Sequence, residues 1–267
     1  MTGSGTAEAP YIVNSWEEYS SVSNSSYYVE FNPNAENKII DFNEICPEGF
    51  SEPIYFAKYT NFNGWTLKNL HSTATKAIFA HYSAKISNLI LENFYWCPQS
   101  AGSYLINCDT SAGTFTNCII SGQIQATKSI TRIIHGTFRE SSLNVIVNTD
   151  DTLGVAAEIL NSEIILDVSA KSVVLCGGKI VNSRVSGKVR TVETFATGDT
   201  GSAYNVFNVQ SDKAIGYSGK GISVYNSDTA PSPATVSDSF KGCTSEQLRD
   251  AQYLYNLRFP IGVDLNE

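Results

Sequence analysis

The sequence predicts an all-β fold, a β-solenoid built from stacked turns of short parallel strands. A hydrophobic phrase recurs through the middle of the chain, with the form apolar-x-Asn-Ser followed by alternating apolar residues. It stands at residues 159–166 and 180–189, with looser copies at 115–120 and 138–143, and its earliest clear copy is at 86–91. The third residues of these copies are 88, 117, 140, 161 and 182, so the later copies are 21 residues apart. Repeats of this length indicate stacked architectures.

Composition supports narrow stacked strands in the middle of the chain. No tyrosine occurs between residues 105 and 203, and Ile, Val, Leu, Ser, Thr, Asn and Gly dominate there. These residues alternate with no helical period, which is typical of strands. The recurrent Asn has two interpretations. It can favour a left-handed corner, or it can stack with the Asn of the next turn in a hydrogen-bonded ladder.

The first sixty residues are expected to form an arm and a cap. Residues 1–10 are small and polar and are expected to extend as an arm that ends at Pro10. Ser15, with Glu18 three residues later, forms a capping box that predicts a helix to about Ser23. Alternating apolar residues predict short strands at residues 11–13, 27–31 and 38–42.

Stacked turns are predicted from about residue 64 to residue 226. At roughly 22 residues a turn this segment supplies roughly seven turns, and a stack of roughly 35 Å, because neighbouring strands lie about 4.8 Å apart. Two prolines in residues 229–234 break the repeat. Thr244 and Ser245 then predict a capped helix to about Asn256, which is expected to cover the open end of the solenoid. The predicted divisions are an N-terminal arm and cap (1–60), a β-helix (61–228), and a spacer with a C-terminal capping helix (229–267).

Charge is distributed unevenly along the chain, whose net charge is −8. Residues 1–60 carry nine acidic and two basic residues, whereas the remainder carries 17 acidic and 16 basic residues. An acidic chain without a basic patch is not expected to bind nucleic acid. The acidic segment is explained either by solubility alone or by contact with a basic partner.

Cysteine spacing and hydropathy narrow the cellular context. The six cysteines form no CxxC pair and no zinc-like cluster with histidine, so we expect free thiols in a reducing compartment. The first residues show no basic segment followed by an apolar core, so no secretory signal is expected. No apolar run approaches the ~20 residues that span a bilayer, so no membrane insertion is expected. The protein is expected to be made in a cytoplasm and to remain soluble.

Two end segments resemble a known class of proteins. Residues 5–19 resemble the G-T-x-x-x-P-Y-x-I-x-S-W-E-D/E-F/L opening of many bacteriophage tail and virion proteins, and of some bacterial surface proteins. Residues 244–263 are similar to the T-x-x-x-L-x-D-x-x-Y-L-x-x-x-G-F-P-I-G ending of phage-encoded β-helical proteins, although Arg258 stands where that pattern has Gly. The resemblance implies a right-handed parallel β-helix in a virion, as a tail, baseplate, receptor-binding or capsid-fibre part. It also implies a homotrimer, and it carries over no catalytic residue.

An enzyme that degrades polysaccharides is the alternative to a structural role. A glycosidase needs two carboxylates that face one sugar. Asp150 and Asp151 are adjacent and would face opposite ways in a strand, whereas Glu163, Asp167 and Asp199 lie on other turns. Turn-forming residues and solvated rim charges explain these carboxylates without catalysis. No metal-ligand spacing relates the three histidines, His71, His81 and His135.

Aromatic residues gather near the start of the chain. All three tryptophans and nine of the fourteen tyrosines precede residue 105. Their amphipathic rings suit sugar faces and protein contacts alike, so a carbohydrate platform and core or subunit-interface packing are both open. Trp16, on the predicted helix, is a candidate anchor for attachment. The candidate binding residues are Trp16, Tyr55, Tyr59, Trp65, Tyr95 and Trp96.

The sequence therefore favours a non-enzymatic structural protein of a bacteriophage virion. Its expected partners are other virion proteins and a host surface glycan, with no cofactor and no metal. Residues 1–60 are expected to attach the protein and the β-helix to be displayed. The alternative function is a tailspike-like enzyme acting on host surface glycans. A bacterial surface adhesin is disfavoured because no secretory signal is recognised.

Overall fold

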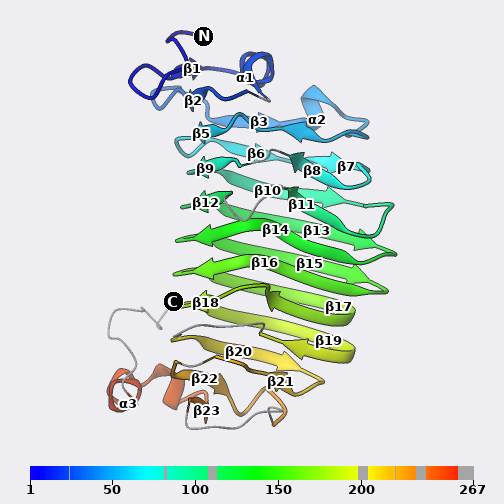
Figure 1. The fold of residues 1–267 in the computed structure, drawn as a ribbon, viewed down its shortest axis with the longest axis vertical. Coiled ribbons are helices and arrows are strands. Elements are labelled where there is room, and N and C mark those ends of the chain that lie inside the picture. Colours follow the sequence, from blue (N-terminus) through cyan, green and yellow to red (C-terminus); the bar gives the residue numbers. More distant parts are fainter. Residues whose placement is uncertain are drawn as a thin grey trace.

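The chain forms a parallel β-helix of about nine turns, which confirms the predicted fold class. The computed structural model describes residues 1–257 except 24, 81–82, 108–112, 198–203, 220 and 233–238. Figure 1 shows the strands stacked in chain order, with the N-terminal turns at one end and the last strands at the other. The stack has more turns than the roughly seven predicted because it begins well before residue 64.

Strands are short at both ends of the stack and long in its middle. The N-terminal turns contain β1 (Tyr11–Val13), β2 (Tyr28–Phe31), β3 (Ile39–Asp41), β4 (Ile54–Tyr55), β5 (Tyr59–Asn61), β6 (Thr66–Lys68), β7 (His71–Ser72), β8 (Ala77–Ala80) and β9 (Lys85–Ser87). The central turns contain β10 (Ile90–Trp96), β11 (Ser103–Asn107), β12 (Thr114–Thr116), β13 (Ile119–Ala126), β14 (Ile130–Arg139), β15 (Ser142–Thr149), β16 (Thr152–Leu160), β17 (Glu163–Cys176), β18 (Ile180–Val181) and β19 (Arg184–Ala196). The last turns contain β20 (Val206–Ser211), β21 (Ile215–Gly216), β22 (Ser223–Asn226) and β23 (Phe240–Cys243).

Inward side chains lie above one another because the strands pair in register from turn to turn. Burial of these apolar columns removes hydrocarbon from water and favours stacking. Leu166, which the alternation places inside, is 0% exposed. One buried column consists of Leu67, Leu91, Ile120, Leu143, Ile164, Val185 and Phe207.

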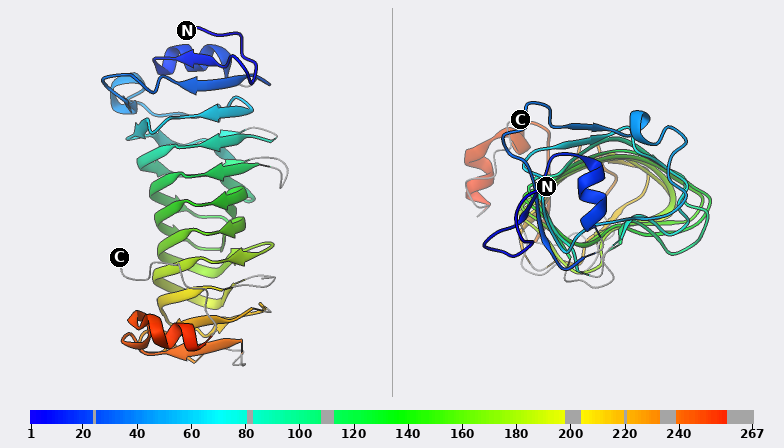
Figure 2. Two further views of the ribbon diagram at one scale, coloured as in Figure 1. Left: turned by 90° about the vertical axis from the view of Figure 1, so that its left-hand side faces the viewer. Right: turned by 90° about the horizontal axis from the view of Figure 1, so that it is seen from above.

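The N-terminal end of the interior is closed by α1 (Trp16–Val22), as the capping box predicts. Ser15 is the N-cap, and its Oγ accepts a hydrogen bond from the Glu18 backbone N–H at 3.2 Å. The Tyr19 hydroxyl oxygen accepts a hydrogen bond from the Ala57 backbone N–H at 3.1 Å inside the stack. Figure 2 shows α1 lying across the end of the interior. The buried residues of α1 are Trp16, Tyr19 and Val22.

Residues 1–10 fold back on the first turn, so the prediction of an extended arm is wrong. Thr2 and Ile12 exchange backbone hydrogen bonds of 3.2 and 2.8 Å in an antiparallel bridge. The terminal amine forms an ion pair with Glu18 at 2.5 Å. The Tyr28 N–H donates to the Gly5 carbonyl at 3.0 Å. These contacts pair the outer edge of β1, which would otherwise expose free backbone groups.

The aromatic N-terminal segment belongs to the stack itself. Strand β2 pairs with β5, β3 with β6 and β4 with β8, so pairing continues across residue 60 without a break. Inside these turns, Phe31 stacks on Phe62 and Phe56 stacks on Phe79, with ring centroids 4.7 and 4.6 Å apart. The two parts differ in composition, while the same parallel stacking runs through both.

The recurrent Asn occupies a left-handed corner and also forms a ladder. Asn88, Asn117, Asn161 and Asn182 have φ between 49° and 55°. The side-chain amide of Asn117 donates to Asn88 Oδ1 at 2.6 Å, and that of Asn182 donates to Asn161 Oδ1 at 3.3 Å. Both interpretations of the recurrent Asn are therefore confirmed. Glu140, with φ of 49°, occupies the corner between these two pairs.

The Ser that follows the Asn is buried and satisfies the backbone of the preceding turn. The Ser141 N–H donates to Ser162 Oγ at 3.2 Å, and the Ser162 N–H donates to Ser183 Oγ at 3.2 Å. The Ser183 N–H donates to Asn205 Oδ1 at 3.0 Å, and the Asn205 N–H donates to Ser223 Oγ at 3.2 Å. We call this series the serine ladder. It supplies hydrogen-bond acceptors to buried backbone N–H groups. A buried N–H group left without an acceptor costs about as much free energy as a lost hydrogen bond.

The C-terminal segment forms two short helices, so the prediction of one continuous helix is wrong. They are η1 (Gln247–Arg249) and α3 (Ala251–Asn256). Asp250 separates them because its Oδ1 caps α3, accepting hydrogen bonds from the N–H groups of Gln252 and Tyr253 at 2.9 and 3.0 Å. Within the described residues, no helix has the length and apolar character needed to cross a membrane.

These helices cover the outer face of the last turns and not the open end predicted from the sequence. Figure 2 shows α3 beside the outline of the solenoid. A second apolar cluster, separate from the interior, forms there. It consists of Val206, Val224, Cys243, Leu248 and Leu254. The ending at residues 258–263 that resembles phage proteins lies outside the described residues.

Candidate functional site

The three tryptophans among the predicted binding residues are buried. Trp65 Nε1 donates to the Asn32 carbonyl at 3.0 Å, and Trp96 Nε1 donates to the Ala74 carbonyl at 3.0 Å. Trp16 is 8% exposed and reaches the surface only at its edge. The structure therefore places Trp65 and Trp96 inside the stack, where they pack and anchor neighbouring turns.

The three predicted tyrosines lie at the surface but on different faces. Tyr55 on β4 is 43% exposed, and Tyr95 on β10 is 39% exposed beside His71. Tyr59 on β5 stacks on Tyr28 with parallel rings and centroids 4.0 Å apart. The six candidate residues are therefore not brought together into one platform. Trp16 and Tyr55 line one hollow at the N-terminal end.

Tyr59 has an electrostatic environment of its own. Its ring lies under the ammonium groups of Lys58 and Lys85, at 5.4 and 5.5 Å from the centroid. A hydrogen bond from Tyr28 lowers the pKa of Tyr59, and the two lysines lower it further. The same hydrogen bond raises the pKa of Tyr28. This patch can accept an anion or a ring, and it lies outside the two hollows described below.

A cleft of about 400 Å³ opens at the N-terminal end, between α1 and residues 49–55. We call it the N-terminal cleft. The aromatic residues in its walls are Trp16, Phe50 and the exposed Tyr55. Its polar lining includes Ser20, Ser23, Ser51 and Glu52.

Packed rings and a tight turn form the floor of the N-terminal cleft. Helix α2 (Phe42–Ile45), which the sequence did not predict, places Phe42 edge-on against Trp16 and Phe50, with centroids 5.0 and 5.4 Å away. Gly49 turns the chain with φ of 79°, and a side chain there would meet the His71 carbonyl. The Phe50 backbone pairs with the next turn through a 2.9 Å bond to that same carbonyl.

Acidic side chains flank the N-terminal cleft. They lie on α1, on α2 and on the segment after α2, and they are exposed. Within the part of the chain that the structure describes, they form no ion pair. A basic partner would therefore find uncompensated negative charge around an aromatic surface. These residues are Glu17, Glu44, Glu48 and Glu52.

The carboxylates considered for sugar hydrolysis do not converge. Glu163 and Asp167 point outward from one strand, four residues apart, which is about 13 Å along the strand. Paired glycosidase carboxylates lie about 5 to 9.5 Å apart. Asp167 is bonded to Arg190 at 2.8 Å, and Asp151 accepts a hydrogen bond from the Thr152 N–H at 2.8 Å. Asp199 lies outside the described residues.

The described part of the chain contains no cluster of metal ligands, and its buried cysteines are not activated as thiolates. No group of three or more His, Cys, Asp and Glu side chains there could hold a metal ion. The five described cysteines are free thiols, as expected. Burial raises the pKa of Cys118 to about 12 and that of Cys176 to about 11, so both stay protonated near neutrality. Two further residues named from the sequence, His81 and Cys108, lie outside the described residues.

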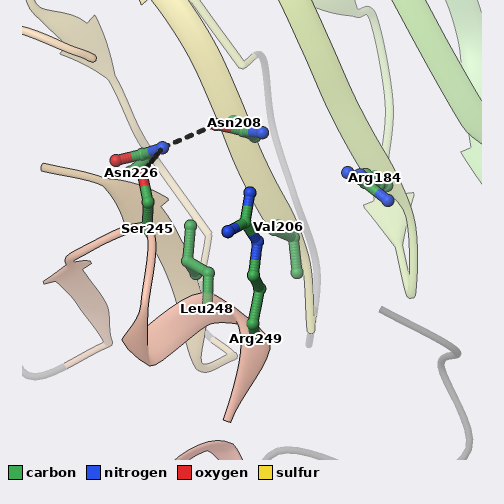
Figure 3. Close-up of a pocket in the computed structure, with 7 residues that line it drawn as sticks. All are labelled: Arg184, Val206, Asn208, Asn226, Ser245, Leu248 and Arg249. Atoms are coloured by element: carbon green, nitrogen blue, oxygen red, sulfur yellow. Dashed lines mark hydrogen bonds between the residues drawn. The ribbon is translucent and has the colours of Figure 1, made fainter. Parts of the chain in front are cut away.

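A second hollow, of about 80 Å³, lies near the C-terminal end between the outer sheet face and η1. Arg184 and Arg249 both line it, and Figure 3 shows them with their neighbours. No pattern in the sequence predicted this hollow, although the sequence did contain one signal. Glu163 and Arg184 occupy the same position in two successive copies of the hydrophobic phrase and pair in register, so the charge at that outward position reverses from one turn to the next. The contribution of Arg249 depends on chain folding after β23.

Comparisons with known proteins give the chain no relative. The resemblance of its two ends to bacteriophage proteins therefore remains a prediction. No family model, no curated protein and no solved structure matches this chain.

Proposed function

We propose that this chain is a structural component of a bacteriophage particle, attached to the particle through its N-terminal end. The β-helix then projects toward the host surface. The observation that carries the proposal is the N-terminal cleft, which has aromatic side chains and Glu52 in its lining and further exposed glutamates on neighbouring segments of the chain. The resemblance of residues 5–19 to phage virion proteins supports the same end as the point of attachment.

The rest of the chain suits display. About nine turns at about 4.8 Å each form a rod of roughly 40 Å, held by continuous parallel ladders. A rod of this kind keeps its outer side chains at constant positions relative to the attached end. Binding residues on the far turns would therefore be presented away from the particle.

The partner expected at the N-terminal cleft is a basic segment with apolar side chains from a neighbouring virion protein. Aromatic side chains that become buried on binding supply much of the binding free energy in interfaces, and Tyr55, which is 43% exposed, can supply such an anchor here. The surrounding carboxylates would steer a basic partner and hold it in register. Glu52 is placed for direct contact because it lines the cleft itself.

Quantitative incorporation into particles tests this proposal. The double variant Tyr55→Ser with Glu52→Lys changes two surface residues of the cleft and leaves the buried residues of α1 in place. Its copy number in purified particles is expected to fall at least about tenfold, which corresponds to about 1.4 kcal/mol of attachment free energy. Tyr95→Ser is the matched control, since Tyr95 is equally exposed on another face. Normal copy number for the double variant would contradict attachment at this cleft.

A further inference from the structure

Strand β4 is the first strand of its face of the solenoid. The turn that begins with β2 continues through β3 and β4, whereas the turn that begins with β1 continues through α1 (Figure 2). A helix therefore occupies the end of the stack where strands preceding β3 and β4 would lie. Within the described residues β4 pairs with one strand, β8, so its other edge faces the end of the stack. This makes β4 an edge strand.

The backbone groups of Tyr55 point to the open edge of β4. The Phe56 N–H donates to the Ala80 carbonyl at 3.1 Å, so Phe56 directs its backbone groups toward β8. In a strand the N–H and C=O of one residue share an edge, and those of the next residue point to the opposite edge. Tyr55 therefore directs one donor and one acceptor away from β8. The outer edge of β1, by contrast, is paired within the chain by Thr2.

The N-terminal cleft lies along this open edge. Ile54 and Tyr55 form part of one wall, and Ser20 and Ser23 of α1 form part of the other. The Ser20 and Ser23 hydroxyls donate to the carbonyls of Trp16 and Ser20 at 2.8 and 3.0 Å, and their oxygens keep lone pairs that can accept. An extended segment in the cleft would thus find backbone partners on one side and hydroxyl acceptors on the other.

We propose that the N-terminal cleft receives an extended segment of the neighbouring virion protein, which adds as a strand to the open edge of β4. The segment forms two backbone hydrogen bonds with Tyr55, one to its N–H and one to its C=O. In strand addition, backbone hydrogen bonds supply affinity and alternate side chains supply specificity. The nearby glutamates favour basic side chains on the segment. The assignment rests on the proposed function and adds the conformation of the bound segment.

Hydrogen exchange of the natural protein tests the assignment. The Tyr55 amide faces the cleft and should exchange rapidly in the free protein. In purified particles its exchange is expected to slow at least about tenfold, because the added strand accepts its hydrogen bond. The Tyr95 amide is the control, since its 2.8 Å bond to the Leu70 carbonyl is present in both states. Equal exchange of the Tyr55 amide in the free protein and in particles would overturn the proposal.

A proline at position 55 isolates the contribution of the backbone. Tyr55→Ser and Tyr55→Pro both remove the ring, but only proline removes the N–H, and strand edges tolerate proline. The copy number of Tyr55→Pro in particles is expected to be at least about fivefold below that of Tyr55→Ser, with equal unfolding midpoints. Equal copy numbers would overturn strand addition. Poor incorporation of the variant that combines Tyr55→Ser with Glu52→Lys, together with unchanged Tyr55 exchange, would overturn strand addition and leave attachment at the cleft standing.

Discussion

The N-terminal turns and the central turns perform the same structural task with different chemistry. Both must fill the interior and provide partners for backbone groups at the corners. The N-terminal turns do this with stacked phenylalanines, with the Trp65 indole nitrogen that donates to a carbonyl, and with the buried hydroxyl of Tyr19. The central turns use mainly aliphatic columns and the serine ladder. Stacking of parallel turns therefore does not require one particular core.

The difference explains why the repeat is visible in only part of the sequence. The regular phrase coincides with the part of the serine ladder in which Ser141, Ser162 and Ser183 follow one another at steps of 21 residues. In the aromatic turns the paired positions lie farther apart, since Val29 pairs with Thr60 and Thr60 pairs with Ile86. Strand pairing between β2 and β5 is nevertheless parallel, as it is between β15 and β17. The periodic phrase marks the uniform turns and does not mark the limits of the fold.

The largest expected effect comes from a charge in the central interior. Leu166→Asp places a carboxylate at a position that is 0% exposed, with no partner. The cost is several kcal/mol, on the order of the whole stability, so the variant is expected not to fold. Circular dichroism and solubility report the loss. Ile119→Asp is the control, since Ile119 is 50% exposed, and equal loss in both variants would contradict the inward assignment.

Alkaline pH should affect the N-terminal turns through Tyr19. Burial raises the pKa of Tyr19 to about 12 from an ordinary value of 10.0. The fold favours the neutral phenol, so its contribution is fully present below pH 10 and is lost as the pH rises toward 12. Tyr19→Phe should cost about 1 to 3 kcal/mol near neutrality, because the Ala57 N–H loses its acceptor.

Denaturant unfolding at several pH values measures this difference. The stability advantage of the natural protein over Tyr19→Phe is expected to shrink between pH 10 and pH 12. Tyr95→Phe changes an exposed tyrosine and should leave the pH profile unaltered. A constant advantage of the natural protein over Tyr19→Phe across this range would contradict the buried, neutral phenol.

Removal of one rung of the serine ladder tests the central turns. Ser162→Ala leaves the buried Ser141 N–H without its acceptor and is expected to cost about 1 to 2 kcal/mol of unfolding free energy. The midpoint of denaturant unfolding measures the loss. Ser169→Ala, at an exposed position of the strand that follows Ser162, should change stability little. Equal losses in the two variants would show that the ladder is not stabilising.

The smallest expected effect is a gain in stability at the corner that Glu140 occupies. Glu140 has φ of 49° at a position where neighbouring turns have Asn. Asn tolerates the left-handed region better than Glu, so Glu140→Asn should raise stability by about 0.5 to 1 kcal/mol. The gain is measured as a higher unfolding midpoint. Glu163→Asn, at an extended position, should give no gain, and a loss in Glu140→Asn would contradict the corner argument.

Much of the fold could be predicted from local patterns. Leu166 and Val185 were placed inside by alternation, and the capping box at Ser15 predicted α1, because both signals act within a few residues. The C-terminal helix was only partly predicted. A helix does form over Ala251–Asn256, but the side chain of Asp250 caps its start and separates it from the turn at Gln247–Arg249. The fold-back of residues 1–10 depends on pairing with β1, which no local pattern encodes.

The candidate sites show the same division. Trp16 and Tyr55 were named from the sequence, yet their common cleft depends on Phe42 and on the turn at Gly49. The other aromatic candidates lie on separate faces or inside the stack. Alternation predicts whether a side chain points inward or outward, but it does not predict which face of the solenoid its strand belongs to. The sequence could not predict that Arg249 and Arg184 line one hollow, because this depends on how the chain folds back after β23.

The sequence by itself determined the stacked parallel architecture, the inward residues and the left-handed Asn corners. These follow from strand alternation and from backbone preferences, which are properties of a few neighbouring residues. The tertiary structure alone decided which outward residues meet, how the first residues cover the edge of β1, and where η1 and α3 rest. Those outcomes depend on contacts between segments far apart in the chain, whose free energies no single stretch of sequence contains.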